Sequence, residues 1–316
     1  MKKLVLSILT VLLAATLFAC GKESHELKMG QAYYAAHGTK AFAVATVVVE
    51  DETIVAAYID EFQFLASDTV TGVPNSETLN SYVKEGYSLA SKRVNNATYS
   101  ANMAGAGSTQ ELAVSYAAIE EYVTGKTVSE LTTLTAKEKE EVLDVVTSST
   151  LVDTKGYISA ILAAVENAKT NKAVSYEGKL EELKLNQVYG AAHGTKCFTI
   201  SAALTAGETI VAAYIDELQY LAADSATGCP NADNREAFGS YIKEGYVIAS
   251  KRVNNALYSA NMAGAGSTVE IAENYNILQD YAAGKTAAEL EGVDTVTSCT
   301  LVDTAGYLAE IATASK

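Results

Sequence analysis

The chain has no tryptophan and only 2 prolines, 3 histidines and 4 cysteines in 316 residues. Such scattered histidines, with no closely spaced cysteine pair, exclude a metal cluster built from neighbouring ligands. Three of the cysteines lie in the second half of the chain, where the first half has alanine, valine and serine: Cys197, Cys229 and Cys299. Because the first half does without them, we predict small buried side chains there and no disulfide framework.

Basic residues are also scarce, with 23 lysines and arginines against 38 acidic residues and a formal net charge of -15. Proteins that bind nucleic acid draw affinity from clustered Lys and Arg, so this balance excludes a nucleic-acid partner. The composition, 49% hydrophobic and 19% charged, is typical of folded globular protein. The length allows two ordinary domains with real cores.

The N-terminus reads MKKLVLSILTVLLAATLFAC, a basic start followed by an apolar run that ends at Cys20. The run is shorter than the ~20 apolar residues of a membrane-spanning helix, so we predict a signal peptide over 1–19. The ending LFAC resembles a bacterial lipobox, which implies cleavage before Cys20 and a diacylglyceryl group on its sulfur. The mature protein would then be held at the extracytoplasmic face of the membrane through a tether, 20–26. An ordinary secretion signal is the alternative, and it leaves Cys20 unexplained.

The rest of the chain is a tandem duplication, which predicts one domain over 27–169, a linker over 170–182 and a second domain over 183–316. The repeated phrases are LKMGQAYYAAHGTKAF (27–42) and LKLNQVYGAAHGTKCF (183–198), TIVAAYIDEFQFLASD (53–68) and TIVAAYIDELQYLAAD (209–224), SKRVNNATYSANMAGAGST (91–109) and SKRVNNALYSANMAGAGST (250–268).

Each half carries the same signals of secondary structure. In the first half two β-branched runs, AFAVATVVVE and TIVAAYIDEFQFL, flank a short polar turn and predict a hairpin. Ser108 with Glu111, and Thr127 with Glu130, predict capping boxes that open two helices, and His37 before a glycine predicts the end of another. The apolar spacing of GYISAILAAVENA predicts a further helix. The expected fold class is α+β, with antiparallel strands and helices packed to one side.

A hydroxyl-rich phrase precedes that last helix in both halves, as DVVTSST (144–150) and DTVTSCT (294–300). A helix N-terminus presents unpaired N–H groups and a partial positive charge, so a phosphate attached just before it is stabilised without a basic side chain. Serine and threonine are also the usual residues of helix caps and turns. Taken singly, each phrase favours that structural role.

Both phrases resemble the flavinylation motif of FMN-binding domains, in which an Asp and a β-branched residue lead to a final Thr or Ser before a helix. Asp144 and Asp294 match the start of the motif, and Thr150 and Thr300 match its final hydroxyl. The resemblance implies that a flavin transferase of the ApbE type joins FMN through its phosphate to each threonine, giving two covalent FMN groups per chain. The departures from the motif are Ser148, Ser298, Ser149 and Cys299, where the family usually has Gly-Ala.

Together with the lipobox, the paired motifs resemble the PplA-like family of flavinylated electron-transfer lipoproteins of Gram-positive bacteria. This resemblance implies an electron carrier rather than an enzyme. It would take electrons from a membrane quinone-linked dehydrogenase and pass them to extracellular acceptors such as ferric iron or soluble flavin. In that family the excised signal fragment can act as a peptide pheromone, here from LVLSILTVLLAATLFA. The alternative is a solute-binding or adhesive lipoprotein whose threonines only cap helices.

The near-identical SKRVNNA(T/L)YSANMAGAG stretch supplies candidates for contacts with the flavin ring. Asparagine amides suit the pyrimidine edge, and Met or Tyr suits the ring face. The candidates are Asn95, Asn96, Tyr99, Asn102 and Met103, with Asn254, Asn255, Tyr258, Asn261 and Met262 in the second half. Helix and turn packing is the alternative for them. For Lys92 and Arg93 we favour a solvated helix face over a role beside a reduced flavin.

Overall fold

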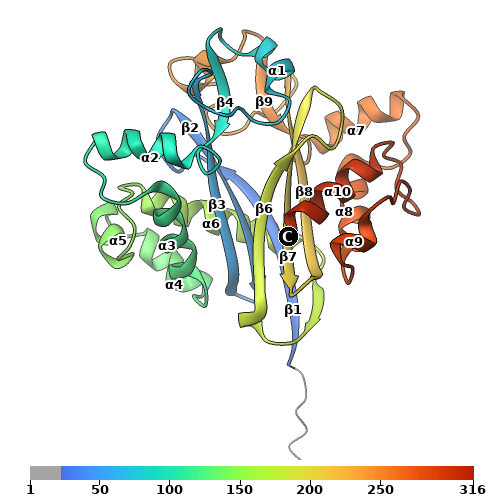
Figure 1. The fold of residues 1–316 in the computed structure, drawn as a ribbon, viewed down its shortest axis with the longest axis horizontal. Helices are drawn as coiled ribbons and strands as arrows, with labels where there is room; N and C mark the ends of the chain where they lie inside the picture. Colours follow the sequence, from blue (N-terminus) through green and yellow to red (C-terminus); the bar gives the residue numbers. More distant parts are fainter. Residues whose placement is uncertain (1–22) are drawn as a thin grey trace, which may run out of the picture.

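The computed structural model describes residues 23–316, and its elements form two antiparallel sheets with helices on their outer sides (Figure 1). The expected mixture of antiparallel strands and helices is confirmed. The predicted signal peptide and Cys20 lie outside the described residues.

The first sheet has the strand order β4-β3-β2-β1-β5 and the second has the order β6-β7-β8-β9. The strands of the first sheet are β1 Ser24–Tyr34, β2 Ala41–Glu50, β3 Thr53–Ala66, β4 Tyr87–Ser91 and β5 Val174–Glu177. Those of the second are β6 Leu183–Gly190, β7 Cys197–Ala206, β8 Thr209–Ala222 and β9 Tyr246–Ser250.

The helices of the first half are α1 Ser76–Leu79, α2 Asn96–Gly105, α3 Leu112–Val123, α4 Val128–Thr135, α5 Lys139–Val145 and α6 Thr154–Thr170. Those of the second half are α7 Asn255–Gly264, α8 Ile271–Ala282, α9 Ala287–Leu290 and α10 Thr304–Ala314. Short 3-10 turns are η1 Asn80–Tyr82, η2 Leu180–Glu182 and η3 Phe238–Tyr241.

The predicted hairpins are present as β2–β3 and β7–β8. Their turns place Asp51 at φ 50° and Gly207 at φ 59°. A two-residue hairpin turn needs a left-handed residue of this kind, and Asp and Gly are among those that tolerate it. The polar turn in each phrase therefore sets the register of the strands that follow.

The central strands are buried on both faces because they lie between the opposite sheet and the helices. Phe42 packs in one cluster with Phe198 of the second half. The alternate residues Ala43 and Val47 pack with α3 and α6 instead. Large side chains thus fill the space between the sheets, and the helices of each half cover the outer face of its own sheet (Figure 1).

The two halves exchange equivalent hydrogen bonds across the interface between the sheets. Tyr33 donates its hydroxyl proton to Asp216 at 2.8 Å, and Tyr189 donates to Asp60 at 2.6 Å. Both aspartates are buried, which raises their pKa, and each tyrosine hydroxyl donates to a buried acceptor that needs a partner. Such a reciprocal exchange is typical of a two-fold interface.

A second exchange involves Asn75 and Asn231. Each side-chain amide donates to two carbonyl oxygens of the opposite half, at distances of 2.8 Å for Asn75 and of 2.9 and 2.8 Å for Asn231. Both residues have left-handed backbone, with φ 62° and 66°, which asparagine adopts more readily than most residues. These loops bind the halves to each other at the same edge as β4 and β9 (Figure 1).

The prediction of a helix that ends at His37 is wrong, and the segment predicted as a linker holds a strand. The phrase that was expected to end a helix at His37 instead forms β1, which pairs with β2 from Leu27 to Tyr34, and His37 lies in the turn after it. Gly30 lets α6 approach this strand, because a Cβ there would lie 2.3 Å from the backbone nitrogen of Ala168. The predicted linker 170–182 contains β5, which adds an edge strand to the first sheet.

Of the two capping boxes predicted in the first half, one is present and the other is not. Thr127 with Glu130 forms the predicted box, and so does the matching pair in the second half. The box at Ser108 is wrong, because α3 begins at Leu112 with Glu111 as its N-cap. The residues SANMAG (100–105) of the repeated stretch form the second part of α2, which ends at Gly105. The chain turns only after that helix, which leaves Ser108 free for another contact.

Candidate functional site

Each half contains a cavity between its helices and the edge of its sheet. The first has a volume of about 610 Å³ and the second of about 580 Å³, within the range of roughly 300–1,000 Å³ of small-molecule sites. The first cavity is lined by residues that include His37, Gln63, Lys92, Tyr99, Asn102, Met103, Ser108, Thr150, Asp153 and Tyr157. The second is lined by their counterparts, including His193, Gln219, Lys251, Tyr258, Asn261, Met262, Ser267, Thr300 and Tyr307.

Several residues that the sequence predicted separately meet in these cavities. Thr150 lies beside the same cavity as Asn102 and Met103, although they come from different elements. The second half repeats this set with Thr300, Asn261 and Met262. Tyr99 and Tyr258 line them too. Each cavity thus combines a hydroxyl, an amide, a thioether and an aromatic ring.

Other candidates lie elsewhere. Asn96 donates to the Glu111 carboxylate at 2.9 Å and accepts from the Ala113 backbone at 2.9 Å, so it holds the start of α3. Asn255 makes the same contacts with Glu270 and Ala272. The buried Asn95 and Asn254 hold backbone groups of the loops before α1 and η3. The exposed Asp144 and Asp294 are not among the residues that line the cavities.

Thr150 has a serine partner that the sequence did not predict. Its Oγ1 lies 2.9 Å from Oγ of Ser108, and Thr300 lies 2.8 Å from Ser267 in the same way. Asn274 adds a donor to Thr300 Oγ1 at 3.1 Å. The sequence signal was the position of Ser108 at the end of a stretch repeated in both halves, where we predicted a helix cap.

The predicted helix does follow the hydroxyl phrase, and its start is pressed against the turn after β1. A Cβ at Gly156 would lie 2.1 Å from the carbonyl oxygen of Ala36, so only glycine allows this approach. The contact brings His37 Nδ1 to 2.6 Å from the Asp153 carboxylate, and His193 reaches Asp303 at the same distance. The N-terminus of α6 is therefore fixed at the edge of the cavity.

A buried ion pair lies under each cavity. Lys251 donates to Glu217 at 2.6 Å, and Lys92 pairs with Glu61. The lysine side chains are 0% and 1% exposed, so the prediction of a solvated helix face is wrong for Lys92. Its ammonium lies 4.3 Å from the centre of the Tyr99 ring, which places a cation against an aromatic side chain of the cavity.

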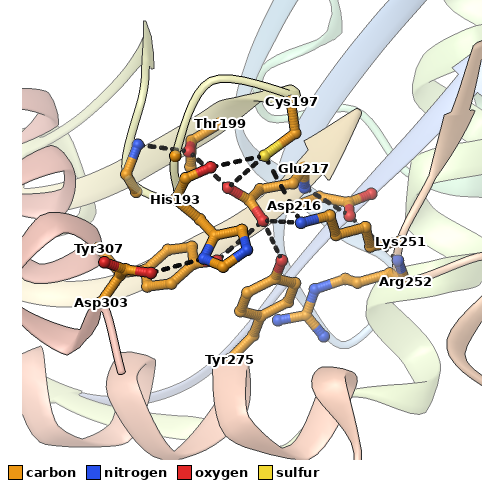
Figure 2. Close-up of polar contacts among 12 residues, drawn as sticks. His193, Cys197, Thr199, Asp216, Glu217, Lys251, Arg252, Tyr275, Asp303 and Tyr307 are labelled. Carbon is orange, nitrogen blue, oxygen red and sulfur yellow. Dashed lines mark hydrogen bonds and ion pairs between the residues drawn. The ribbon is translucent and has the colours of Figure 1, made fainter. Parts of the chain in front are cut away.

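Neighbouring groups stabilise the charged forms of Glu217 and Lys251. Burial pushes the pKa of Glu217 upward, but the charge of Lys251 and the hydrogen bonds from Lys251, Tyr307 and Tyr275 outweigh it and leave the pKa lowered. Figure 2 shows the two tyrosines converging on the carboxylate, at 2.8 and 2.9 Å. Burial lowers the pKa of Lys251, and the attraction of Glu217 more than reverses this. The pair is therefore ionised at neutral pH.

The two halves differ at the second oxygen of the buried carboxylate. Glu217 Oε1 accepts from Thr199 at 3.1 Å and contacts Cys197 at 3.5 Å. The first half has alanines at those positions, and among residues 23–316 Glu61 Oε1 has no hydrogen-bond partner. Burial raises the pKa of Cys197 to about 12, so its thiol stays neutral. The prediction of small buried cysteines is confirmed for Cys197 and Cys229.

A second cation, Arg93, is also held inside and not on a solvated face. It pairs with Glu120, which additionally accepts from the Ile59 backbone at 2.6 Å. In the second half Gln279 replaces that carboxylate, accepting from Arg252 and from the Ile215 backbone at 3.0 Å. The Gln279 amide thus accepts the same two kinds of hydrogen bond as the Glu120 carboxylate but carries no charge.

We expect Glu120→Gln to reduce the pH dependence of stability. Burial raises the pKa of Glu120 from 4.5 to about 7, so its contribution is fully present below pH 4.5 and is lost as the pH rises through 7. One pKa unit corresponds to about 1.4 kcal/mol. As the pH rises from 4.5 to 7, the free energy of unfolding of the variant should therefore increase by about 1–3 kcal/mol relative to that of the wild type. Urea denaturation at a series of pH values measures this, with Glu121→Gln, at an exposed position, as control. Plots of unfolding free energy against pH that run parallel for Glu120→Gln and wild type would contradict the prediction.

No family model, curated protein or solved structure matches the chain. Within residues 23–316, no three His, Cys, Asp or Glu side chains are grouped as a metal site would need. No helix in that range is both long and apolar enough to cross a membrane.

Proposed function

We propose that the protein is an electron carrier that holds one FMN covalently on Thr150 and one on Thr300. The observation that carries this proposal is the position of each motif threonine, which borders a cavity of cofactor size together with an amide, a methionine and a tyrosine. In this proposal each half is a small FMN-binding-type domain, and the pair forms a tandem duplication.

The residues present fit such a group. The phosphate ester on Thr150 would lie beside Ser108 and before the N-terminus of α6, where backbone N–H groups and the helix dipole favour an anion. Tyr99 and Met103 would lie against the ring, and the amide of Asn102 would reach its polar edge. The second half offers the same set of residue types.

Covalently bound FMN supplies the redox chemistry. The protein's own residues position it and shape the charge around it. Lys92 and Lys251 place an ammonium below each cavity, neutralised by a buried glutamate. The ester bond keeps the cofactor at high effective concentration whatever the affinity of the cavity, which suits a protein exposed to an extracellular medium.

The proposed setting follows from the leader sequence. With Cys20 lipidated, the carrier would stay at the extracytoplasmic face of the membrane, receive electrons from a quinone-linked dehydrogenase and deliver them to ferric iron or soluble flavin. It would be loaded by a flavin transferase and would turn over no substrate of its own.

The test is expression of the protein with and without a flavin transferase of the ApbE type, followed by a denaturing gel. A carrier gives a fluorescent band only when the transferase is present. Flavin attached through an ester stays on the denatured chain, whereas noncovalently bound flavin is released. A band that stays dark beside a known flavinylated control protein would favour the alternative, a solute-binding or adhesive lipoprotein.

A further inference from the structure

A third cavity, of about 600 Å³, lies between the two halves, away from both motif threonines. Its walls come from β1, the end of α6, β8, the start of α8, the loop 227–230 and the segment 250–253 at the end of β9, which carries Arg252. The residues that decide its chemistry are Tyr33, Asn167, Tyr214, Asp216, Arg252 and Asn276.

Arg252 is the cation of this cavity, and it is bound only by neutral groups. Its Nε donates to the Ile215 carbonyl at 2.5 Å, Nη1 donates to Asn276 at 3.0 Å, and Nη2 donates to Gln279. Across residues 23–316, no carboxylate oxygen lies within 4.0 Å of its guanidinium nitrogens. A guanidinium has five N–H groups, so two remain for a ligand.

The neighbouring amides are oriented as donors. Asn167 Oδ1 accepts from the Gln31 backbone at 3.0 Å, from the Tyr214 hydroxyl at 3.1 Å and from Asn171 at 3.3 Å. These three bonds fix the side chain and leave its Nδ2 as a donor. Asn276 Oδ1 accepts from Arg252, which leaves its Nδ2 as a donor too.

Asp216 limits the charge that the cavity accepts. Its carboxylate already accepts from Tyr33 at 2.8 Å, from the backbone nitrogens of Glu217 and Arg252 at 2.7 and 3.1 Å, and from Ser250. It therefore lines the wall as a satisfied anion rather than as a partner for a ligand. Its charge opposes a dianion more strongly than a monoanion.

We propose that this third cavity binds a small organic carboxylate with a single negative charge. Arg252 receives the carboxylate, and the amides of Asn167 and Asn276 donate to it or to an adjacent hydroxyl or carbonyl oxygen. The inference does not depend on the flavin sites.

The comparison between the halves supports the same conclusion. In the first half the matching Arg93 is paired with Glu120 of the chain itself. In the second half Gln279 holds that position, so no carboxylate is paired directly with the guanidinium, although its charge acts on the nearby Asp216 and lowers the pKa that burial has raised there. A carboxylate would add the attraction between opposite charges to the hydrogen bonds that the Arg252 guanidinium now gives only to neutral acceptors.

The test uses the full chain and lactate as probe, with its neutral isostere lactamide as control. Lactate, at constant ionic strength, should raise the midpoint of thermal unfolding and shift a defined set of amide NMR signals around Arg252, whereas lactamide should not. Gln279→Glu should weaken lactate binding at least tenfold, because the new carboxylate would pair with Arg252 in place of lactate. The variant should still fold, because the first half already contains the same arrangement in Arg93 and Glu120.

Asn276→Ala, which installs the residue of the first half at that position, should weaken binding several-fold. Glu120→Gln, in the other half, should leave it unchanged. The proposal is overturned if lactate and lactamide act alike, or if Gln279→Glu binds lactate as well as wild type does. Tighter binding of succinate or inorganic phosphate than of lactate would also overturn it.

Discussion

Replacement of Thr150 by valine is expected to remove one of the two covalent FMN groups, and Thr300→Val the other. Valine keeps the branched shape but has no hydroxyl to carry the phosphate. The double variant should contain no covalent flavin. Flavin absorbance per chain in protein denatured after expression with the transferase measures this directly, with expected values of about two, one, one and none.

The matched controls are Thr150→Ser and Thr300→Ser, which keep the hydroxyl and should keep the flavin. Ser108→Ala and Ser267→Ala remove only the neighbour of the acceptor oxygen. They should slow the attachment without abolishing it. Full flavin content in the double valine variant would show that the ester forms elsewhere, and the assignment of both threonines would then be wrong.

The second large effect is on stability. Lys251→Met should lower the free energy of unfolding by about 3–5 kcal/mol, because it leaves Glu217 charged and unpaired in the interior. The double change with Glu217→Gln should recover part of that loss, since no buried charge then remains. Lys172→Met removes an exposed pair with Asp280 and should change stability by less than about 1 kcal/mol.

Urea denaturation measures these differences, and pH provides a further check. The lowered pKa of Glu217 means that its stabilisation is present above the pKa of the unfolded chain and is lost as pH falls through the folded pKa. The gap between wild type and Lys251→Met should therefore narrow in acid. A loss for Lys251→Met as small as that for Lys172→Met would contradict the account of the buried pair.

Local patterns predicted the parts of the fold that depend on local interactions. The β-branched runs identified the hairpins, and the Thr127–Glu130 box identified a helix start. The strand β1 was missed because its sequence mixes Gly, Gln and Tyr, and its conformation depends on pairing with β2 and β5. The Ser108–Glu111 pair has the spacing of a cap, yet both side chains have partners from other elements.

Some residues of the candidate site could also be predicted from local sequence patterns, and others could not. The duplicated motif singled out Thr150 and Thr300, and the repeated asparagine-methionine stretch supplied Asn102, Met103 and their counterparts; all of these residues line the two cavities. The buried role of Lys92 could not be predicted, because Glu61 is 31 positions away and a lysine in a polar stretch is usually solvated. The reciprocal contacts of Tyr33 and Tyr189 depend on how the halves face each other, which no single repeat encodes.

The most direct measurement is tandem mass spectrometry of the proteolytic peptides that contain Thr150 and Thr300, from protein produced with an active flavin transferase. We predict that both peptides carry the mass of FMN and that fragmentation places it on those two side chains. Unmodified peptides at both positions, in a sample where a known substrate of the same transferase is fully flavinylated, would contradict the proposed function.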